Sequence, residues 1–543
     1  MKMSDHEAPA GPGRPDTSST GSLVATLPGR RSATSSTITN GSKAPWSALM
    51  NVIMLAPNDS VAVACEPLTT GDLAVGDEIS VIVRQDIGAG HKVAVRDVAA
   101  GETVVKYGHP IGHATQPIRA GDWVHSHNLA TDLSTNLVYE FEPRPNLPIV
   151  RQPEATFQGY RRDNGDVGVR NTLLIVPTVG CINGTAQALA RQFEKTHDDF
   201  GHFDGVVVAA HPFGCSQLGD DLAATRTILQ NIVCHPNAGG VLVIGLGCEN
   251  NQLDELRAGL GWYGPSRVRF MVAQDSPDEM AEGARLLEEL DAAASADERT
   301  EVALSQLRVG VKCGGSDGFS GLTANPLVGQ FADYLVGQGG SVVMTEVPEM
   351  FGAEQALMAR AANRAVFDQI VSMVDGFKDY FRRYDQPIYD NPSPGNKQGG
   401  ITTLEEKSLG AIQKSGSSTV VDVLDYGQRV TRPGVSLLAG PGNDLVSATA
   451  LACAGCQLVL FTTGRGTPFG TFVPTLKIST NKSLAERKPG WIDFDAGALL
   501  SEPMTHVAQS FTNLVLLAAS GQPALNEINR MQQIAIFKDG VIE

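Results

Sequence analysis

The sequence predicts an α/β protein in which a small all-β module precedes two α/β units with mainly parallel sheets. Two patterns support this fold class. Between residues 52 and 129, short runs of alternating apolar and polar residues are separated by glycines, which is typical of strands joined by tight turns. From residue 158 onward, nearly continuous apolar runs alternate with helical periodicity. This second pattern indicates parallel sheets covered by helices on both faces.

Composition narrows the class of protein. The chain has 543 residues, of which 42% are hydrophobic, and a formal net charge of −17. A domain usually has about 100–200 residues, so we expect roughly three domains. The acidic balance disfavours nucleic acid and anionic membranes as partners, and no apolar run reaches the roughly 18 residues of a membrane span. The 8 cysteines are too sparse for a disulfide scaffold, so we expect reduced thiols and a cytoplasmic protein.

The chain begins with a segment of different composition. Residues 1–49 are rich in Ser, Thr, Gly and Pro, and such a segment buries too little apolar surface to offset its ordering entropy. We expect a disordered tail. A transit peptide is disfavoured because Asp5, Glu7 and Asp16 interrupt the acid-poor composition of such peptides. A third interpretation is that translation starts at Met50.

The predicted β module covers residues 50–141, with strands in "SVAVAC", "EISVIVRQDI" and "HKVAVRDV" and turns at "TTGD" and "AAGE". A proline-rich stretch at 142–157 has the composition of a linker.

The first α/β unit is predicted at 158–303 and the second at 304–543. Strands of the first unit are expected in "TLLIVPTVG", "GVVVAA", "GVLVIGLG" and "VRFMVAQ", and those of the second in "LRVGVKCGG", "GSVVMTEV", "GVSLLAG", "LVLFTTG" and "TLKIST". We place the boundary near a charged helix end at 296–306 and expect one long helix near 353–384.

Four predicted strands end in a cysteine, at Cys181, Cys215, Cys248 and Cys313. The carboxyl ends of parallel strands face one crevice, so we expect these thiols to converge on one pocket as metal ligands or acid/base groups. The alternative is that each thiol is a small buried hydrophobe. An iron–sulfur cluster is conceivable, although the thiols lack the usual tight spacing. The C-x-x-C pair of Cys453 and Cys456 lies where a helix runs into a strand, which favours packing.

The β module also carries candidate ligands and bases. His125 and His127 are two residues apart, so on a strand they would share a face and could hold a divalent metal or a carboxylate. The alternative interpretation is a pair of solvent-facing or hydrogen-bonded histidines. His91 and Lys92 lie in "GHKVAVRD", and Lys106 lies in "KYG".

Glycine-rich loops of the second α/β unit are suited to an anionic ligand. "NPSPGNKQGG" contains Lys397 and "TTGRGTPFG" contains Arg465, each beside hydroxyl or amide donors, and "KCGGSDGFSGLTANP" adds a polar wall. Neither cationic loop matches the P-loop, and "GLGCEN" does not continue as G-x-G-x-x-G, so ATP and NAD are disfavoured.

Together these strings resemble the altronate/galactarate dehydratase family of sugar-acid dehydratases. The resemblance runs from about residue 50 to 543 and rests on long motifs such as "GYRRDNGDVGVRN", "GCSQLGDD", "VIGLGCENNQ", "TEVPEMFGAEQ" and "NPSPGNKQGGITTLEEKSLG". It implies that the β module is a SAF-type (β-clip) domain. "VHSHN" and "PEMFGAEQ" resemble the altronate branch, whereas residues 1–49 have no counterpart in the family.

The resemblance implies loss of water from D-altronate to form 2-dehydro-3-deoxy-D-gluconate. A base removes the proton on C2 and an acid assists departure of the C3 hydroxyl, with a divalent metal or clustered cations stabilising the enediolate. Fe(II) is the implied metal, with Mn(II) as an alternative, and a homodimer is the implied assembly. The residues predicted for these roles are His91, His125, His127 and His211 as metal ligands, Lys92, Lys106, Cys215, Cys248 and Cys313 as catalytic groups, and Ser316, Asp317, Asn396, Lys397, Thr463 and Arg465 around the substrate.

Two alternatives stay open from the sequence. The first is a dehydratase of galactarate or another aldonic or aldaric acid. The second is a sugar-acid-binding protein that retains the fold without catalysis. Turnover on a panel of sugar acids separates all three hypotheses.

Overall fold

The computed structural model describes residues 50–77, 79–133, 138–144, 154–261 and 263–542. The tail predicted at 1–49 and most of the predicted linker at 142–157 lie outside these residues. The boundaries expected between the folded parts stay predictions. None of the helices among the described residues is long and apolar enough to cross a membrane.

The β module consists of short antiparallel strands, as the alternating pattern predicted. One sheet has the order β1-β2-β5-β8, a second has the order β6-β7-β9, and β3 pairs with β4. Gly71, Gly101 and Gly121 occupy left-handed turns, where a side chain would be strained. The strands are β1 (Val52–Ile53), β2 (Val61–Ala64), β3 (Leu73–Val75), β4 (Ser80–Ile82), β5 (Lys92–Ala94), β6 (Thr103–Lys106), β7 (His109–Ala114), β8 (Trp123–Val124) and β9 (Leu129–Ala130).

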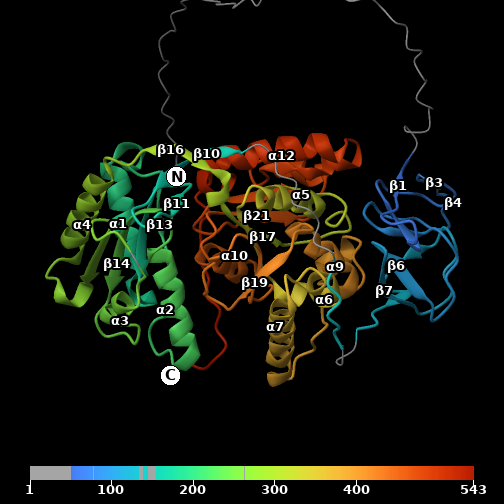
Figure 1. Cartoon of the computed structure of the whole chain (residues 1–543), viewed down its shortest axis with the longest axis horizontal. Coiled ribbons are helices and arrows are strands. Elements are labelled where there is room, and N and C mark those ends of the chain that lie inside the picture. The colour runs from blue at the N-terminus through green and yellow to red at the C-terminus, as the bar shows by residue number, and fades with distance from the viewer. Residues whose placement is uncertain (1–49, 78, 134–137, 145–153, 262, 543) are drawn as a thin grey trace, which may run out of the picture. The chain divides into compact units, whose positions relative to one another are not determined.

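The first α/β unit contains a parallel sheet of order β13-β12-β14-β15 with helices on both faces (Figure 1). Successive apolar residues point to opposite faces, so Leu173 packs with α1 and α4, whereas Leu174 packs with α2 and α3. Its elements are β12 (Thr172–Pro177), α1 (Asn183–Thr196), β13 (Gly205–Val208), α2 (Gly219–Val233), β14 (Ala238–Gly245), α3 (Leu253–Ala258), β15 (Val268–Val272) and α4 (Glu279–Ala294).

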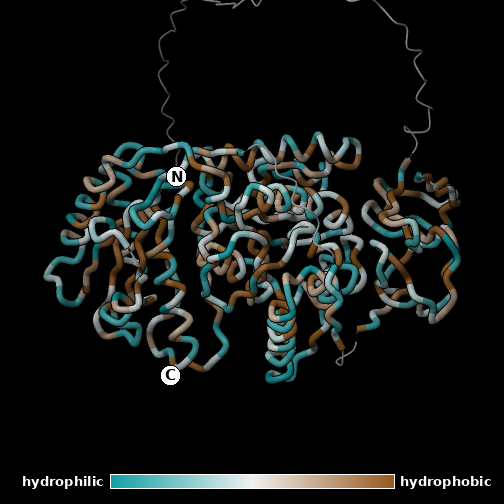
Figure 2. Tube along the Cα trace, in the orientation of Figure 1, coloured by the Kyte–Doolittle hydropathy of each residue, from teal (hydrophilic) through white to brown (hydrophobic). Residues whose placement is uncertain are grey.

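The second α/β unit contains a larger parallel sheet of order β19-β20-β18-β17-β21-β22-β23. Hydrophobic residues are concentrated in the strands of both parallel sheets (Figure 2). Its strands are β17 (Arg308–Cys313), β18 (Ser341–Met344), β19 (Val420–Leu424), β20 (Gly434–Leu438), β21 (Leu458–Thr463), β22 (Thr475–Ser479) and β23 (Phe494–Asp495), and its helices are α5 (Ala324–Gly337), α6 (Glu354–Met358), α7 (Arg364–Arg383), α8 (Pro394–Gln398), α9 (Leu404–Ala411), α10 (Asp444–Cys453), α11 (Lys482–Arg487), α12 (Met504–Ala519) and α13 (Leu525–Ile528).

Two predictions about helices were wrong. The helix expected over 353–384 is divided into α6 and α7, because residues 360–362 pair with the start of β19 and Asn363 then caps α7. The charged segment 296–306 is not a helix end: β16 (Arg299–Ala303) pairs antiparallel with β10 (Thr156–Arg161), which also pairs with β11 (Val167–Gly168).

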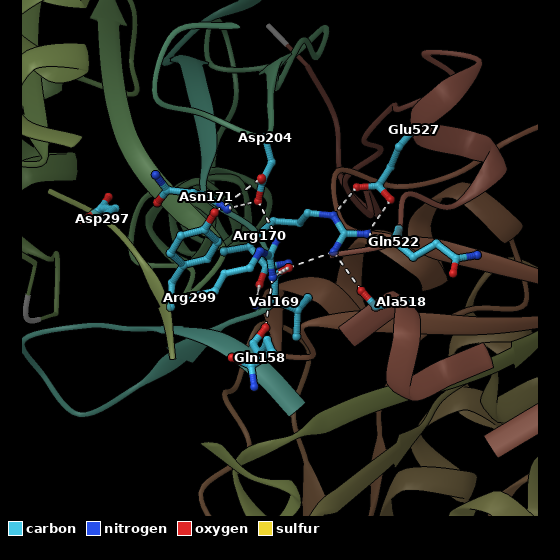
Figure 3. A network of polar contacts seen from close by, with 12 residues as sticks. Gln158, Val169, Arg170, Asn171, Asp204, Asp297, Arg299, Ala518, Gln522 and Glu527 are labelled. Atoms are coloured by element: carbon cyan, nitrogen blue, oxygen red, sulfur yellow. Dashed lines mark hydrogen bonds and ion pairs between the residues drawn. The ribbon is translucent and has the colours of Figure 1, made fainter. Parts of the chain in front are cut away.

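The two α/β units share a core and a buried ion pair. Helices α2 and α10 pack together, and Cys453 and Cys456 lie in that apolar interface, which confirms their packing role. Arg170, from "GVRN", extends from the first unit to the end of α12 and to α13 (Figure 3). Its guanidinium donates to both carboxylate oxygens of Glu527 at 2.8 and 2.9 Å and to the carbonyl of Ala518 at 2.8 Å. This part of the long motif is therefore structural.

We predict that Arg170→Met lowers the free energy of unfolding by about 3 kcal/mol, because it removes the guanidinium from the Glu527 carboxylate and from the buried carbonyls of Val169 and Ala518. Urea unfolding followed by circular dichroism measures the change. The matched control is Arg364→Met, which removes an exposed i,i+4 pair with Asp368 and should cost no more than about 0.5 kcal/mol. Equal losses in the two variants would contradict the structural role.

Candidate active site

Residues predicted for the site converge on the short helix α8. Nε2 of His125 lies 2.8 Å from the carbonyl oxygen of Lys397, and Nε2 of His91 lies 3.2 Å from that of Gln398. The amide of Asn396 donates to the carbonyl of Ser316 at 2.7 Å. One face of the β module and the loop after β17 therefore meet at α8.

The histidines of the β module are not arranged as the sequence predicted. His125 and His127 lie in a turn between β8 and β9 and not on a strand, because β8 ends at Val124. The indole N–H of Trp123 donates to Nδ1 of His91 at 3.1 Å, so Nε2 of His91 carries the proton. Burial and the neighbouring His125 lower the pKa of His91 to about 4, so this ring is neutral at pH 7.

Two exposed cations line the same region. The Arg465 guanidinium donates to Oε1 of Gln398 at 3.1 Å, and Lys397 lies on α8 next to that glutamine. Neither cation forms an ion pair with any residue that the structure describes. Both can therefore bind a carboxylate.

Several predicted substrate residues instead hold the loops in place. The buried Asp317 carboxylate accepts from Thr480 at 2.8 Å and from Asn481 at 3.0 Å, and Thr463 accepts from the backbone N–H of Gly466 at 2.8 Å. These contacts fix the loops on which Arg465 and Ser316 lie.

Lys92 and Lys106 belong to a buried ion triad below α8. Both ammonium groups lie 2.8 Å from the carboxylate of Glu406 on α9, and all three side chains are at most 1% exposed. Lys92 also donates to the carbonyl of Gly400 at 2.9 Å and to the hydroxyl of Thr402 at 2.8 Å, so its three N–H groups all have acceptors. Burial favours protonation of Glu406, but the two lysines outweigh it and hold the pKa of Glu406 at about 2.

A second group of cations surrounds the Phe461 ring at the carboxyl edge of the large sheet. Nζ of Lys312 lies 4.5 Å and Nζ of Lys477 lies 5.1 Å from the ring centroid. Lys312 donates to Asp444 at 2.7 Å, and the side chain of Asp444 is 35% exposed. A Cβ on Gly314 would lie 2.6 Å from the Asp444 carboxylate, so only glycine leaves room at this turn.

The environments of these two lysines separate their pKa values. Burial and the charge of Lys312 outweigh the acidic neighbours and lower the pKa of Lys477 to about 8. Burial also disfavours the charge on Lys312, but Glu346 and Asp444 outweigh it and raise the pKa of Lys312. At neutral pH Lys312 is therefore a cation, whereas a fraction of the Lys477 amine is neutral.

Cys313 lies beneath this group with two buried carboxylates. Cys313, Glu346 and Glu349 each offer one ligand atom within 4.8 Å of the others, which makes a possible metal site. Three lysines already contact the same atoms, with Lys414 at 3.0 Å from the Cys313 sulfur and Lys407 at 2.8 Å from Glu349. Since lysine charges balance the carboxylates, these residues fit a divalent cation poorly. Burial and Glu349 raise the pKa of the Cys313 thiol to about 12, so it keeps its proton.

The remaining predicted residues lie elsewhere. Cys215, Cys248 and His211 follow strands of the first α/β unit, so the four thiols expected in one pocket are divided between two sheets. Both ring nitrogens of the buried His211 are engaged by backbone, at 2.9 Å from the carbonyl of Pro177 and 3.2 Å from the N–H of Phe213.

Sequence reasoning overlooked Lys477, Asp444, Glu346, Glu349, Glu406, Lys407 and Lys414. One signal was present: Lys477 interrupts "TLKIST", an otherwise uncharged strand that is buried throughout. A lysine in such a strand must find partners or lose its charge, and both outcomes are typical of functional sites.

We predict that Glu406→Gln destabilises the protein by about 3–5 kcal/mol, because two buried ammonium groups lose their counterion. The pKa of Glu406 is about 2 in the folded protein against 4.5 for an ordinary glutamate. Its stabilising contribution is therefore complete above pH 4.5 and is lost as the pH falls toward 2.

Urea midpoints of wild type and variant, measured at several pH values, should converge on acidification. The control is Glu486→Gln, which removes an exposed i,i+4 pair with Lys482. If Glu406→Gln is as stable as this control, the buried triad does not stabilise the folded protein.

Comparison with known proteins identifies the family. Residues 50–132 match the altronate/galactarate dehydratase SAF domain, residues 159–295 match the second domain of D-galactarate dehydratase/altronate hydrolase, and residues 304–542 match the D-galactarate/altronate dehydratase C-terminal domain. The chain is 52% identical to altronate dehydratase of Bacillus subtilis (strain 168) over 496 residues, which cover 91% of this chain and 100% of the relative.

Altronate dehydratase of Escherichia coli (strain K12) is also 52% identical, over 494 residues that cover 91% of this chain and 100% of the relative. The galactarate dehydratase (L-threo-forming) of the same strain is 35% identical over 485 residues, which cover 83% of this chain and 90% of that protein. Both the domain order and the whole-length identity support one conclusion. The chain belongs to the D-galactarate/altronate dehydratase family.

Proposed function

We propose that this protein is a hydro-lyase that converts D-altronate to 2-dehydro-3-deoxy-D-gluconate and water. The observation that carries the proposal is the 52% identity to two altronate dehydratases over their full length, against 35% to a galactarate dehydratase. The exposed cations beside α8 and the cationic group around Phe461 supply chemistry that this reaction needs.

Arg465 and Lys397 are proposed to bind the substrate carboxylate. A Cβ on Gly315 would lie 3.1 Å from Cβ of Arg465, and a Cβ on Gly314 would lie 2.6 Å from the Asp444 carboxylate. This glycine turn therefore lies between Arg465 and Asp444. A sugar acid lying over the turn can place its carboxylate at Arg465 and its C2–C3 bond toward Asp444 and Lys312. Asn396 and Ser316 hold α8 against the turn and thereby position Lys397.

Lys477 is proposed as the base that accepts the C2 proton. The pair of electrons from the C–H bond moves into the enediolate, and the charge on Lys312 stabilises the added negative charge on the carboxylate. The enediolate electrons then form the C2=C3 double bond as the C3–O bond breaks. Lys312, which donates to Asp444, gives a proton to the departing C3 hydroxyl, and this group leaves as water. The resulting enol tautomerises to the 2-keto acid.

The other buried residues that were predicted as catalytic groups are proposed to have positioning roles. Lys92 and Lys106 are proposed as positioning residues, since Glu406 holds both ammonium groups, and Cys313 is proposed to keep the buried lysines in place.

The proposed metal is Fe(II), with Mn(II) as the alternative, from the family resemblance. Its predicted ligands His91, His125 and His127 do not bring three ligand atoms within 4.8 Å of one another in the described structure. His211 follows β13 in the first α/β unit. As arranged here, these residues do not fit the metal. A homodimer stays the proposed assembly.

We expect the purified protein, supplied with Fe(II), to release a 2-keto acid from D-altronate with kcat/KM at least 100-fold above that for galactarate and other aldonic or aldaric acids. A panel assay with semicarbazide detection measures the product. A higher kcat/KM for galactarate than for D-altronate would show that galactarate is the substrate. Absence of turnover on every acid, with binding of altronate by calorimetry, would instead support a non-catalytic binding protein.

The proposed base predicts a pH dependence. With the pKa of Lys477 at about 8, kcat/KM should rise with pH and level off above about pH 8, because only the neutral amine accepts a proton. Lys477→Met should lower kcat by roughly 10²–10⁴-fold, and added alkylamines should restore part of the rate.

The matched control for the base is Lys482→Met, an exposed lysine five positions farther along the chain, which should keep the wild-type rate and profile. A Lys477→Met variant that retains the wild-type pH profile would assign the base to another group.

A further inference from the structure

A second cavity is lined by the β6-β7 hairpin, helix α9 and the segment that follows α6. Its volume is about 630 Å³, which is within the range typical of sites for small ligands. Tyr107 and His109 line it from the hairpin, Leu409 from α9 and Arg360 from the segment after α6. None of the described residues that line this cavity belongs to the candidate active site, so the cavity is separate from that site.

The charged groups around this cavity are basic. Among the described residues that line it are Arg144, Arg360 and His109, and none of these lining residues carries a carboxylate. The chain as a whole has a formal net charge of −17, so the cavity differs in sign from the rest of the protein. Carboxylates line instead a neighbouring cavity of about 470 Å³, which shares Arg144 and His109. A hollow with unbalanced positive charge attracts anions.

The Arg360 guanidinium is held in a fixed orientation by the loop that follows α9. Its Nε donates to the carbonyl of Ser418 at 2.9 Å, and its two terminal nitrogens donate to the hydroxyl and the carbonyl of Ser415, both at 3.0 Å. The loop is itself fixed, because the N–H of Ser418 donates to Asp333 at 2.8 Å and Gly416 is left-handed with a φ of 67°. Described residues thus engage three of the five N–H groups of Arg360 and leave two for a ligand.

A backbone hydrogen bond brings the second arginine next to the first. The N–H of Arg144 donates at 2.8 Å to the carbonyl of Ala359, the residue before Arg360. The Arg144 side chain is exposed and has no hydrogen-bond or ion-pair partner in the part of the chain that the structure describes. Burial of Arg360 and the like charge of Arg144 outweigh the favourable charge of Asp333 and lower the pKa of Arg360 to about 10. An anion bound by both arginines would relieve this repulsion.

The cavity also has an apolar part. Leu55 from the β module and Leu409 and Ile412 from the end of α9 and the turn after it are among its lining residues. Sites for small organic ligands combine apolar lining of this kind with a few fixed polar groups that set the orientation of the ligand. The occupant therefore has both an anionic group and a carbon skeleton.

We propose that this cavity binds a small organic phosphate, with the phosphate group on Arg144 and Arg360 and the carbon skeleton against Leu55, Leu409 and Ile412. A phosphate monoester carries a charge of about −1.5 to −2 at pH 7 and has three terminal oxygens, so it accepts from two guanidinium groups at once. A monocarboxylate has one charge and two oxygens, and a single guanidinium satisfies it. The paired arginines therefore favour the phosphate.

This binding site goes beyond the proposed dehydration and does not depend on it. The substrate of that reaction carries a carboxylate, which is assigned to Arg465 and Lys397, and neither of these residues lines the cavity. The occupant would contact Leu409 on α9, the helix that also carries Glu406 of the buried triad.

Isothermal titration calorimetry of the full-length protein with phenyl phosphate tests the proposal. We expect one site per chain. Inorganic phosphate, which lacks the apolar group, and benzoate, which lacks the phosphate, should each bind at least about 10-fold more weakly. Saturation with D-altronate should leave the binding of phenyl phosphate unchanged, because the two ligands occupy different sites.

Two variants locate the site. Arg144→Gln changes an exposed side chain and should weaken phenyl phosphate binding at least about 10-fold while the circular dichroism stays that of the wild type. Arg360→Lys keeps the charge but removes the planar fork, and it should also weaken binding. Arg119→Gln changes an exposed arginine of the β module outside the cavity, and Arg465→Gln changes the cation of the candidate active site. Both of these control variants should bind phenyl phosphate as the wild type does.

Absence of binding at phenyl phosphate concentrations up to about 10 mM would overturn the proposal. Wild-type affinity in Arg144→Gln would overturn it too, and this exposed variant decides the matter if Arg360→Lys does not fold. Displacement by D-altronate, or loss of binding in Arg465→Gln, would place the phosphate in the candidate active site instead. Benzoate that binds as tightly as phenyl phosphate would refute the assignment of the ligand as a phosphate.

Discussion

The buried contact of Glu406 with Lys92 and Lys106 is the constraint on which the candidate active site depends. Glu406 lies on α9, whose residues are all buried, and the two lysines come from β5 and β6 of the β module. Burying three charges is costly unless each is paired and hydrogen-bonded, so the triad tolerates few arrangements. It therefore sets the position at which His91 and His125 meet α8.

The same helix extends this constraint to the large sheet. Lys407 follows Glu406 in sequence and binds Glu349 at 2.8 Å, while Glu405 accepts from the backbone of Asp132 at 2.8 Å. Three consecutive charged residues of α9 thus face three different partners. Because Glu349 also accepts from the Cys313 thiol, α9 links the β module to the end of β17.

The separation of lysine pKa values shows how one residue type can serve different purposes. Lys312 and Lys477 share the Phe461 ring, but only Lys312 has carboxylates in direct contact. Desolvation dominates at Lys477 and lowers its pKa to about 8, whereas paired charge dominates at Lys312 and raises its pKa. From the sequence alone, Lys312 and Lys477 would both be expected to have the pKa of an ordinary lysine.

Hydrophobic periodicity by itself determined the fold class and most strands and helices, because it records which faces are buried locally. The motif glycines located the loops around Lys397 and Arg465. Tertiary structure alone decided which strand ends share an edge, since pairing order depends on contacts between distant segments. It separated Cys313 from Cys181, Cys215 and Cys248, and it selected among buried lysines through partners such as Glu406, whose approach no local pattern of residues encodes.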